Sequence, residues 1–184
     1  MTTFTTSKTI EELNGILQLQ KANLAQGLSQ LEIQTQGFVT VSHSLDDLLK
    51  LNQIEQHLIM KNEEQVVGYL LAMTKKSRND IPVLIPMFQL FDKIKYGEKL
   101  VSDYNYLVVG QVCIHKNYRG LGLFDQSYAA YKSLFQHKYD FAITEISVNN
   151  TRSINAHKRV GFVELHQYTD TNNIAWSVVI WDWK

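Results

Sequence analysis

A tight glycine turn carries the residues whose types and spacing first suggest chemistry. It reads Lys-Asn-Tyr-Arg-Gly-Leu-Gly-Leu-Phe over positions 116–124, with Gly120 and Gly122 one residue apart. A strand-like apolar run precedes the turn and an amphipathic helix follows it. Such a turn points several backbone N–H groups at one spot, with the positive end of the helix dipole behind them. It indicates a phosphate site, because glycine lets an anion reach the backbone. The alternative is a plain turn between a buried strand and a core helix.

Two known kinds of phosphate loop fit this turn poorly. No Gly-Lys-Ser or Gly-Lys-Thr sequence follows the glycines, which excludes a Walker loop. The glycines lack the Gly-x-Gly-x-x-Gly spacing, and no acidic residue follows about 20 positions on at a second strand end. A dinucleotide-binding fold is therefore not favoured.

The turn instead resembles motif A of the GNAT superfamily of acyl-CoA-dependent N-acyltransferases, Gln/Arg-x-x-Gly-x-Gly/Ala. Arg119 and Gly122 match that motif, whereas Phe124 stands where Gly or Ala is usual. A second block, Asn-Thr-Arg-Ser-Ile-Asn-Ala-His-Lys-Arg-Val-Gly-Phe over 150–162, resembles the superfamily's Asn-x-x-Ala/Ser-x-x-x-Tyr-x-x-x-Gly-Phe segment. His157 takes the place of the usual tyrosine. The resemblance is close over residues 106–165 and extends elsewhere only to the order of elements.

The resemblance implies a fold, a reaction and a set of cofactor contacts. The fold is α+β, with helices flanking a mixed, mostly antiparallel central sheet. The reaction moves an acetyl group from acetyl-CoA to a primary amine of a small molecule or peptide by direct attack, without a metal. Backbone groups of the turn would cradle the pyrophosphate, and a strand edge and a helix start would contact the pantetheine arm. The residues implied are Val112, Ile114, Arg119, Gly120, Leu121, Gly122, Leu123, Phe124, Asn150, Ser153 and Asn155.

Two proton transfers must accompany this reaction. An alkyl ammonium, with a pKa near ~10.4, must lose a proton before it attacks, and the departing thiolate must be stabilised. The resemblance places His157 as the proton donor to the thiolate, since a ring N–H can replace a phenol. The alternative is a histidine that only packs on its helix.

The general base is less clearly indicated. The carboxylate usual in the superfamily falls near Gln111, and a neutral amide cannot act as a base. His115 and Glu145 are the nearby candidates, and a water relay to backbone carbonyls is the third. These departures leave a second function open, namely a non-catalytic acyl-CoA-binding sensor or scaffold of the same fold.

Composition bounds the remaining possibilities. The 184 residues, 45% of them hydrophobic, suit one domain over 1–184. Eighteen basic side chains balance eighteen acidic ones, so neither nucleic acid nor a membrane is an expected partner. The expected partner is the amine acceptor, and a homodimer is left open. One cysteine, Cys113, in an apolar run and no visible signal peptide lead us to expect a cytoplasmic protein.

The rest of the chain supplies the elements that position these residues. A capping box at Thr9 predicts a first helix ending near Gly27, and Ser44 caps a second helix. Residues 37–41 read as a loop or a brief extended piece. Further along, the patterns predict strands at 57–60, 65–73, 107–114 and 141–148, a helix at 151–160 and a hairpin of 162–168 with 174–183.

An insertion at about 75–104 interrupts this order between two core strands. It contains a short helix that begins at Pro82 or Pro86. A connection of this length is often a lid or a substrate wall. The alternative is an apolar flap that packs over the sheet without touching a ligand.

Overall fold

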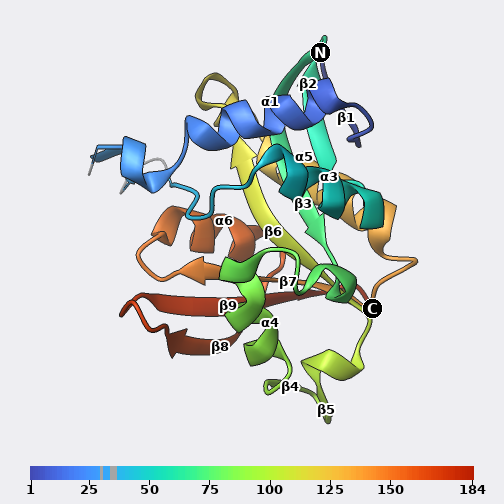
Figure 1. Cartoon of the computed structure of the whole chain (residues 1–184), viewed down its shortest axis with the longest axis vertical. Helices are drawn as coiled ribbons and strands as arrows, with labels where there is room; N and C mark the ends of the chain where they lie inside the picture. Colours follow the sequence, from blue (N-terminus) through green and yellow to red (C-terminus); the bar gives the residue numbers. More distant parts are fainter. Residues whose placement is uncertain (30, 34–36) are drawn as a thin grey trace.

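Strands form one central sheet in the computed structural model, which describes residues 1–29, 31–33 and 37–184. The sheet order is β1-β2-β3-β6-β7-β9-β8 (Figure 1). Its strands are β1 (Thr2–Thr6), β2 (Leu58–Asn62), β3 (Gln65–Met73), β6 (Tyr106–Ile114), β7 (Phe141–Ser147), β8 (Val163–Thr169) and β9 (Ala175–Asp182). Among these neighbours β6 and β7 are parallel, and the other pairs are antiparallel.

Helices flank this sheet on both faces. The α-helices described are α1 (Ile10–Lys21), α3 (Leu45–Ile54), α4 (Ile85–Phe91), α5 (Leu123–Phe135) and α6 (Thr151–Val160). Short 3₁₀ turns lie at Ala25–Gly27, Lys75–Ser77, Pro82–Leu84, Val101–Asp103 and Lys116–Tyr118, and β4 (Lys95–Tyr96) pairs with β5 (Lys99–Leu100). The predicted α+β fold with a mixed, mostly antiparallel sheet is confirmed.

Strand β3 shows how the sheet buries both faces. Tyr69 and Leu71 pack with α1 and α3, whereas Leu70 and Ala72 point to the other face and pack with α5. All four side chains are fully buried. Alternation along a strand sends successive side chains to opposite faces, so a wholly apolar strand needs a cover on each side.

The start of α1 is as predicted, but its end is not. Thr9 and Glu12 form the expected capping box, in which the Glu12 N–H donates to the Thr9 hydroxyl over 3.2 Å. The helix ends at Lys21 rather than near Gly27. The Asn23 amide donates to the Leu19 carbonyl over 2.7 Å, and Leu24 then leaves the helical path.

The first strand has no counterpart in the sequence-based reading. Strand β1 pairs antiparallel with β2 over five residues, from Thr2 opposite Asn62 to Thr6 opposite Leu58. Threonine favours strands, and Phe4 in the middle of this one packs against the core. The remaining elements agree with prediction to within a few residues.

The insertion packs on the same face of the sheet as α1 and α3. Phe88, Phe91 and Val101 are at most 1% exposed and share a cluster with Tyr106 and Phe141. The Phe91 ring meets the Tyr106 ring edge-on, with centroids 5.9 Å apart. This is the packing expected of an apolar flap.

Strands β6 and β7 part soon after they begin, which opens the middle of the sheet. They pair only from Tyr106 opposite Phe141 to Val108 opposite Ile143, although both strands continue. Just past this point the Thr144 hydroxyl donates to the Val109 carbonyl over 2.8 Å. On its other side β7 stays paired with β9 along its whole length. The gap therefore lies between two firmly held halves of one sheet.

Candidate active site

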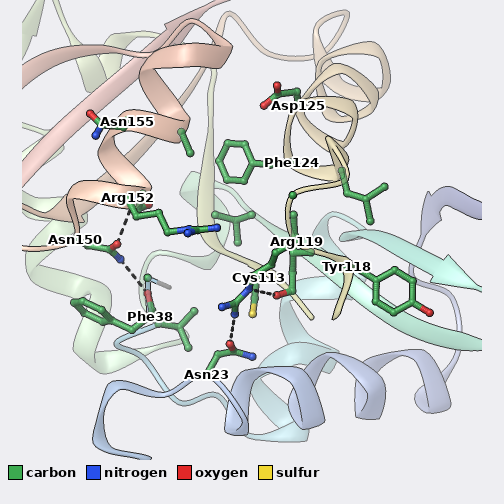
Figure 2. A pocket seen from close by; sticks show the side chains of 18 of the residues that line it. Asn23, Phe38, Cys113, Tyr118, Arg119, Phe124, Asp125, Asn150, Arg152 and Asn155 are labelled. Atoms are coloured by element: carbon green, nitrogen blue, oxygen red, sulfur yellow. Dashed lines mark hydrogen bonds between the residues drawn. The ribbon is translucent and has the colours of Figure 1, made fainter. Parts of the chain in front are cut away.

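A cavity of about 570 Å³ lies between the glycine turn and α6 (Figure 2). All of the residues expected to hold the cofactor line it except Leu121, whose side chain is 62% exposed. The expected residues that the structure brings together here are Val112, Ile114, Arg119, Gly120, Gly122, Leu123, Phe124, Asn150, Ser153 and Asn155.

The two glycines of the turn adopt conformations that other residues rarely reach. Gly120 has φ +78° and Gly122, the N-cap of α5, has φ +74°. A Cβ built on Gly120 would meet no atom within 4 Å. The turn thus leaves open space in front of the N-terminus of a 13-residue helix, where an anion is favoured.

The edge of β6 offers backbone groups to the same cavity. The His115 N–H donates to the Val67 carbonyl over 2.8 Å, so this residue faces β3. Because backbone groups alternate along an antiparallel ladder, those of Val112 and Ile114 face the gap. The Ile114 carbonyl accepts a bond of 3.0 Å from Arg119 Nε. Val112 is therefore the residue best placed to pair with an amide of a bound chain.

Arg119 fastens the turn to the segment after α1. Its guanidinium reaches from the turn to the Asn23 side chain (Figure 2). Burial lowers the pKa of this guanidinium. Cys113 lies beside it at 6% exposure, and burial raises the pKa of the thiol to about 12.

Cationic side chains from α6 border the cavity on its other side. Figure 2 shows Arg152 extending from the start of α6 across the cavity. Arg159 pairs with Asp125 of α5 at 2.7 Å, and both of these side chains are exposed. Two arginines of α6 thus border the cavity, and one of them is paired with an acidic residue that also lines it.

Asn150 caps α6, as the sequence predicts, and has a second partner. Its Oδ1 accepts the Ser153 N–H over 3.2 Å, while its Nδ2 donates to the Phe38 carbonyl over 3.1 Å. Asn150 thereby joins α6 to the segment before α3. Asn155 is exposed at the rim of the cavity.

His157 is buried, and both of its ring nitrogens have partners. Nδ1 lies 2.8 Å from the Ser153 carbonyl and must carry the proton, so Nε2 accepts from the Tyr128 hydroxyl at 2.6 Å. Burial lowers the pKa of His157 to about 4, so the ring is neutral at pH 7. Its ring makes edge-to-face contacts with Phe124 and Phe162.

A smaller cavity continues from the first into the gap between β6 and β7. The two share the lining residues Phe38, Val39, Val112, Asn150 and Ser153. The smaller cavity is also bordered by Gly110, Gln111, Thr144, Glu145, His157 and Trp176.

Glu145 gives this smaller cavity a titratable carboxyl group. Its Oε2 accepts from the Tyr168 hydroxyl at 2.6 Å. Burial raises the pKa of Glu145 to about 7, the Tyr168 bond opposes that rise, and the charge of Asp170 adds to it. A carboxyl group with this pKa can take up a proton near neutral pH.

His115, the other candidate base, does not border either cavity. It caps the 3₁₀ turn Lys116–Tyr118, where its Nδ1 accepts the Asn117 N–H at 3.3 Å. Its ring lies edge-on to Tyr118, with centroids 5.8 Å apart. The geometry therefore brings Glu145 to the gap and leaves His115 outside it.

Sequence reasoning missed several residues of the site. Phe38 and Val39 line both cavities, although residues 37–41 were expected only to be a loop or an extended piece. Tyr168 and Trp176 face each other across the β8–β9 pair beside Glu145. The available signal was the pair of aromatic residues flanking the predicted turn of the last hairpin.

Within 1–29, 31–33 and 37–184, no three His, Cys, Asp or Glu side chains gather closely enough to hold a metal ion. No helix in these ranges has the length and apolar character needed to cross a membrane.

Solved structures share this fold over nearly the whole chain. The NatC complex bound to Gag peptide and CoA matches with a TM-score of 0.65, 13% identity and 98% coverage of each chain. The ribosomal-protein-S18-alanine N-acetyltransferase from Escherichia coli matches with a TM-score of 0.63 and 12% identity, over 99% of this chain and 94% of that enzyme's chain. The structure of yncA from Salmonella typhimurium with its cofactor acetyl-CoA matches with a TM-score of 0.63 and 13% identity. The match covers 100% of this chain and 94% of the yncA chain.

Sequence comparison then defines the family. The model of the acetyltransferase (GNAT) family matches residues 28–162, which include the glycine turn, the gap and α6. The chain belongs to the GNAT family of acetyltransferases. A comparison with curated proteins found no match.

Proposed function

We propose that this protein transfers an acetyl group from acetyl-CoA to a primary amine of a small molecule or peptide. The observation that carries the proposal is the Glu145 carboxyl, whose pKa is about 7, in a cavity continuous with the one beneath the glycine turn. A proton acceptor thus lies beside a site suited to a phosphate-bearing acyl donor. Transfer by direct attack needs both.

Acetyl-CoA would occupy the larger cavity. The N–H groups of the turn and the start of α5 suit its pyrophosphate, and the edge of β6 at Val112 suits its pantetheine amides. Among the structures with the same fold, the NatC complex contains CoA and yncA contains acetyl-CoA.

Glu145 would act as the general base. The ammonium of the acceptor gives its proton to the carboxylate, and the freed nitrogen lone pair attacks the thioester carbon. The carbon–sulfur bond then breaks and its electrons leave with sulfur. The nitrogen gives up its second proton as this bond breaks, and the thiolate takes up that proton because an ordinary thiol has a pKa of about 8.5. Glu145 releases the first proton to solvent.

We keep His157 as the residue proposed to act on the departing thiolate, through a hydrogen bond donated by its ring N–H. Because its pKa is about 4, the ring acts as a neutral N–H donor rather than as a cation. The group available for this role is Nδ1–H, which must exchange its bond to the Ser153 carbonyl for one to sulfur. Because both ring nitrogens of His157 already have hydrogen-bond partners, this arrangement also supports the second candidate function, a non-catalytic acyl-CoA sensor or scaffold.

Glu145→Gln separates these functions. It removes the base but keeps an acceptor for the Tyr168 hydroxyl. We expect kcat to fall by about 10²–10⁴ when free thiol is measured with acetyl-CoA and a panel of an alkylamine, lysine and a short peptide. The exposed Glu98→Gln is the matched control.

One outcome would count against the enzyme and another against Glu145 as its base. A parent protein that shows a thermal shift with acetyl-CoA but acetylates no amine of the panel would support the sensor. A Glu145→Gln variant as fast as the parent would show that another group takes the proton.

A further inference from the structure

The segment from Gly37 to His43, here named the strap, lies between α1 and α3 in the chain. It passes in front of the middle of the sheet, where β6 and β7 part (Figure 1). Phe38, Val39 and Thr40 of the strap line the smaller cavity opposite Glu145 and its neighbours on β7. A ligand in that cavity would therefore touch the strap on one side and the sheet on the other.

Gln111 on β6 holds the middle of the strap. Its side chain is 8% exposed, and its Nε2 donates to the Val41 carbonyl over 2.9 Å. Its Oε1 accepts from the Tyr69 hydroxyl at 2.6 Å and from Gln20 Nε2 at 3.0 Å. Two donors meet at Oε1, so the NH₂ group must face Val41.

The ends of the strap are fastened by other elements. At one end the Asn150 amide of α6 donates to the Phe38 carbonyl, as Figure 2 shows. At the other end the His43 N–H donates to Gln20 Oε1 over 2.7 Å. Between these ends Val39 makes backbone hydrogen bonds with Asn23 and Ala25. Gln111 then ties Val41 directly to β6, the strand that borders the gap.

We propose that Gln111 is a positioning residue, whose amide holds the strap against the sheet and so shapes the cavity that receives the acceptor amine. This inference rests on the proposed function, because the acceptor must reach Glu145 through that cavity. Gln111 takes no part in proton transfer. Its bond to Val41 is a structural contact that a carboxylate at the same position could not make.

Gln111→Glu tests the inference with little change in shape. At pH 8.5 an ionised carboxylate keeps the bonds from Tyr69 and Gln20 but opposes the Val41 carbonyl. Hydrogen exchange of peptides covering residues 38–43 should become about five- to tenfold faster, as expected when one buried hydrogen bond is lost. The KM for the amine should rise by a similar factor, while the affinity for acetyl-CoA stays the same.

Tyr69→Phe is the matched control. It removes a donor to Gln111 Oε1 but leaves the bond to Val41, so both exchange in the strap and the amine KM should match the parent. Asn150→Asp provides a second variant, which keeps the cap on α6 and frees the Phe38 end of the strap.

The outcomes separate this inference from the proposed function. Unchanged exchange in both Gln111→Glu and Asn150→Asp overturns the holding role. Faster exchange with an unchanged amine KM overturns the role in shaping the acceptor cavity. If the parent transfers no acetyl group at all, the proposed function fails and the acceptor role fails with it. The exchange data still decide whether Gln111 holds the strap.

Discussion

Three buried histidines should make this protein lose stability as the pH falls below about 6.5. His43, His57 and His157 are 6%, 0% and 2% exposed, and burial lowers their pKa values to about 4, 3 and 4 from an ordinary 6.5. Near pH 5 each is neutral in the folded protein and protonated in the unfolded chain. Unfolding therefore takes up protons at this pH.

The sign follows from the depressed folded pKa values. The stability due to these groups is fully present above pH 6.5 and is lost as the pH falls toward 4 and 3. Glu145 acts in the opposite direction, because its folded pKa of about 7 lies above its ordinary 4.5. The net uptake by these four groups near pH 5 is about two protons, so their contribution should lower the free energy of unfolding by about 2.7 kcal/mol per pH unit.

Urea unfolding followed by tryptophan fluorescence at pH 7.5, 6.0 and 5.0 measures this slope. His157→Gln should reduce it by about 1.4 kcal/mol per pH unit, since one proton fewer is taken up. His137→Gln, which changes an exposed histidine, should leave the slope unchanged. A free energy of unfolding that stays constant between pH 6.5 and 5, or a His157→Gln slope equal to that of the parent, would refute this reasoning.

Three further predictions concern the site and the insertion. Gly122→Val should abolish the thermal shift produced by CoA, because the side chain is strained at φ +74° and fills the turn; an equal shift in variant and parent would make the turn purely structural. Phe91→Ala should cost about 3–5 kcal/mol in urea unfolding while the exposed Val83→Ala costs little, whereas equal effects would mean that the insertion is not core. Tyr168→Phe removes a bond that lowers the Glu145 pKa, so the acidic limb of the kcat/KM profile should move to higher pH; an unmoved limb would contradict the assigned base.

Features fixed by neighbouring residues could be predicted from the sequence. The capping box at Thr9 and the N-cap at Ser44 each depend on a few consecutive side chains and were placed correctly. The glycine turn between a strand and a helix was likewise predicted from its residues. Local hydrogen bonds leave a local pattern in the sequence.

Features that depend on distant contacts could not be predicted. Strand β1 is a strand because β2 lies beside it some 50 residues later, as the pairing of Thr6 with Leu58 shows. The separation of β6 from β7 after Val108 is a property of backbone pairing, and no side-chain pattern in the sequence predicts it. The proposal of Glu145 rather than His115 as the base needed the gap itself, since only the folded chain brings Glu145 into the smaller cavity with Gln111.

The burial of Cys113 has a consequence for how the two substrates of the proposed transfer would meet. With a pKa of about 12, fewer than about one in 10⁴ of these thiols is a thiolate at neutral pH. The lone thiol beside the larger cavity is thus a poor nucleophile and cannot readily store the acyl group between two half-reactions. Initial-velocity lines obtained at several fixed acceptor concentrations should therefore intersect, as for a ternary complex, rather than run parallel.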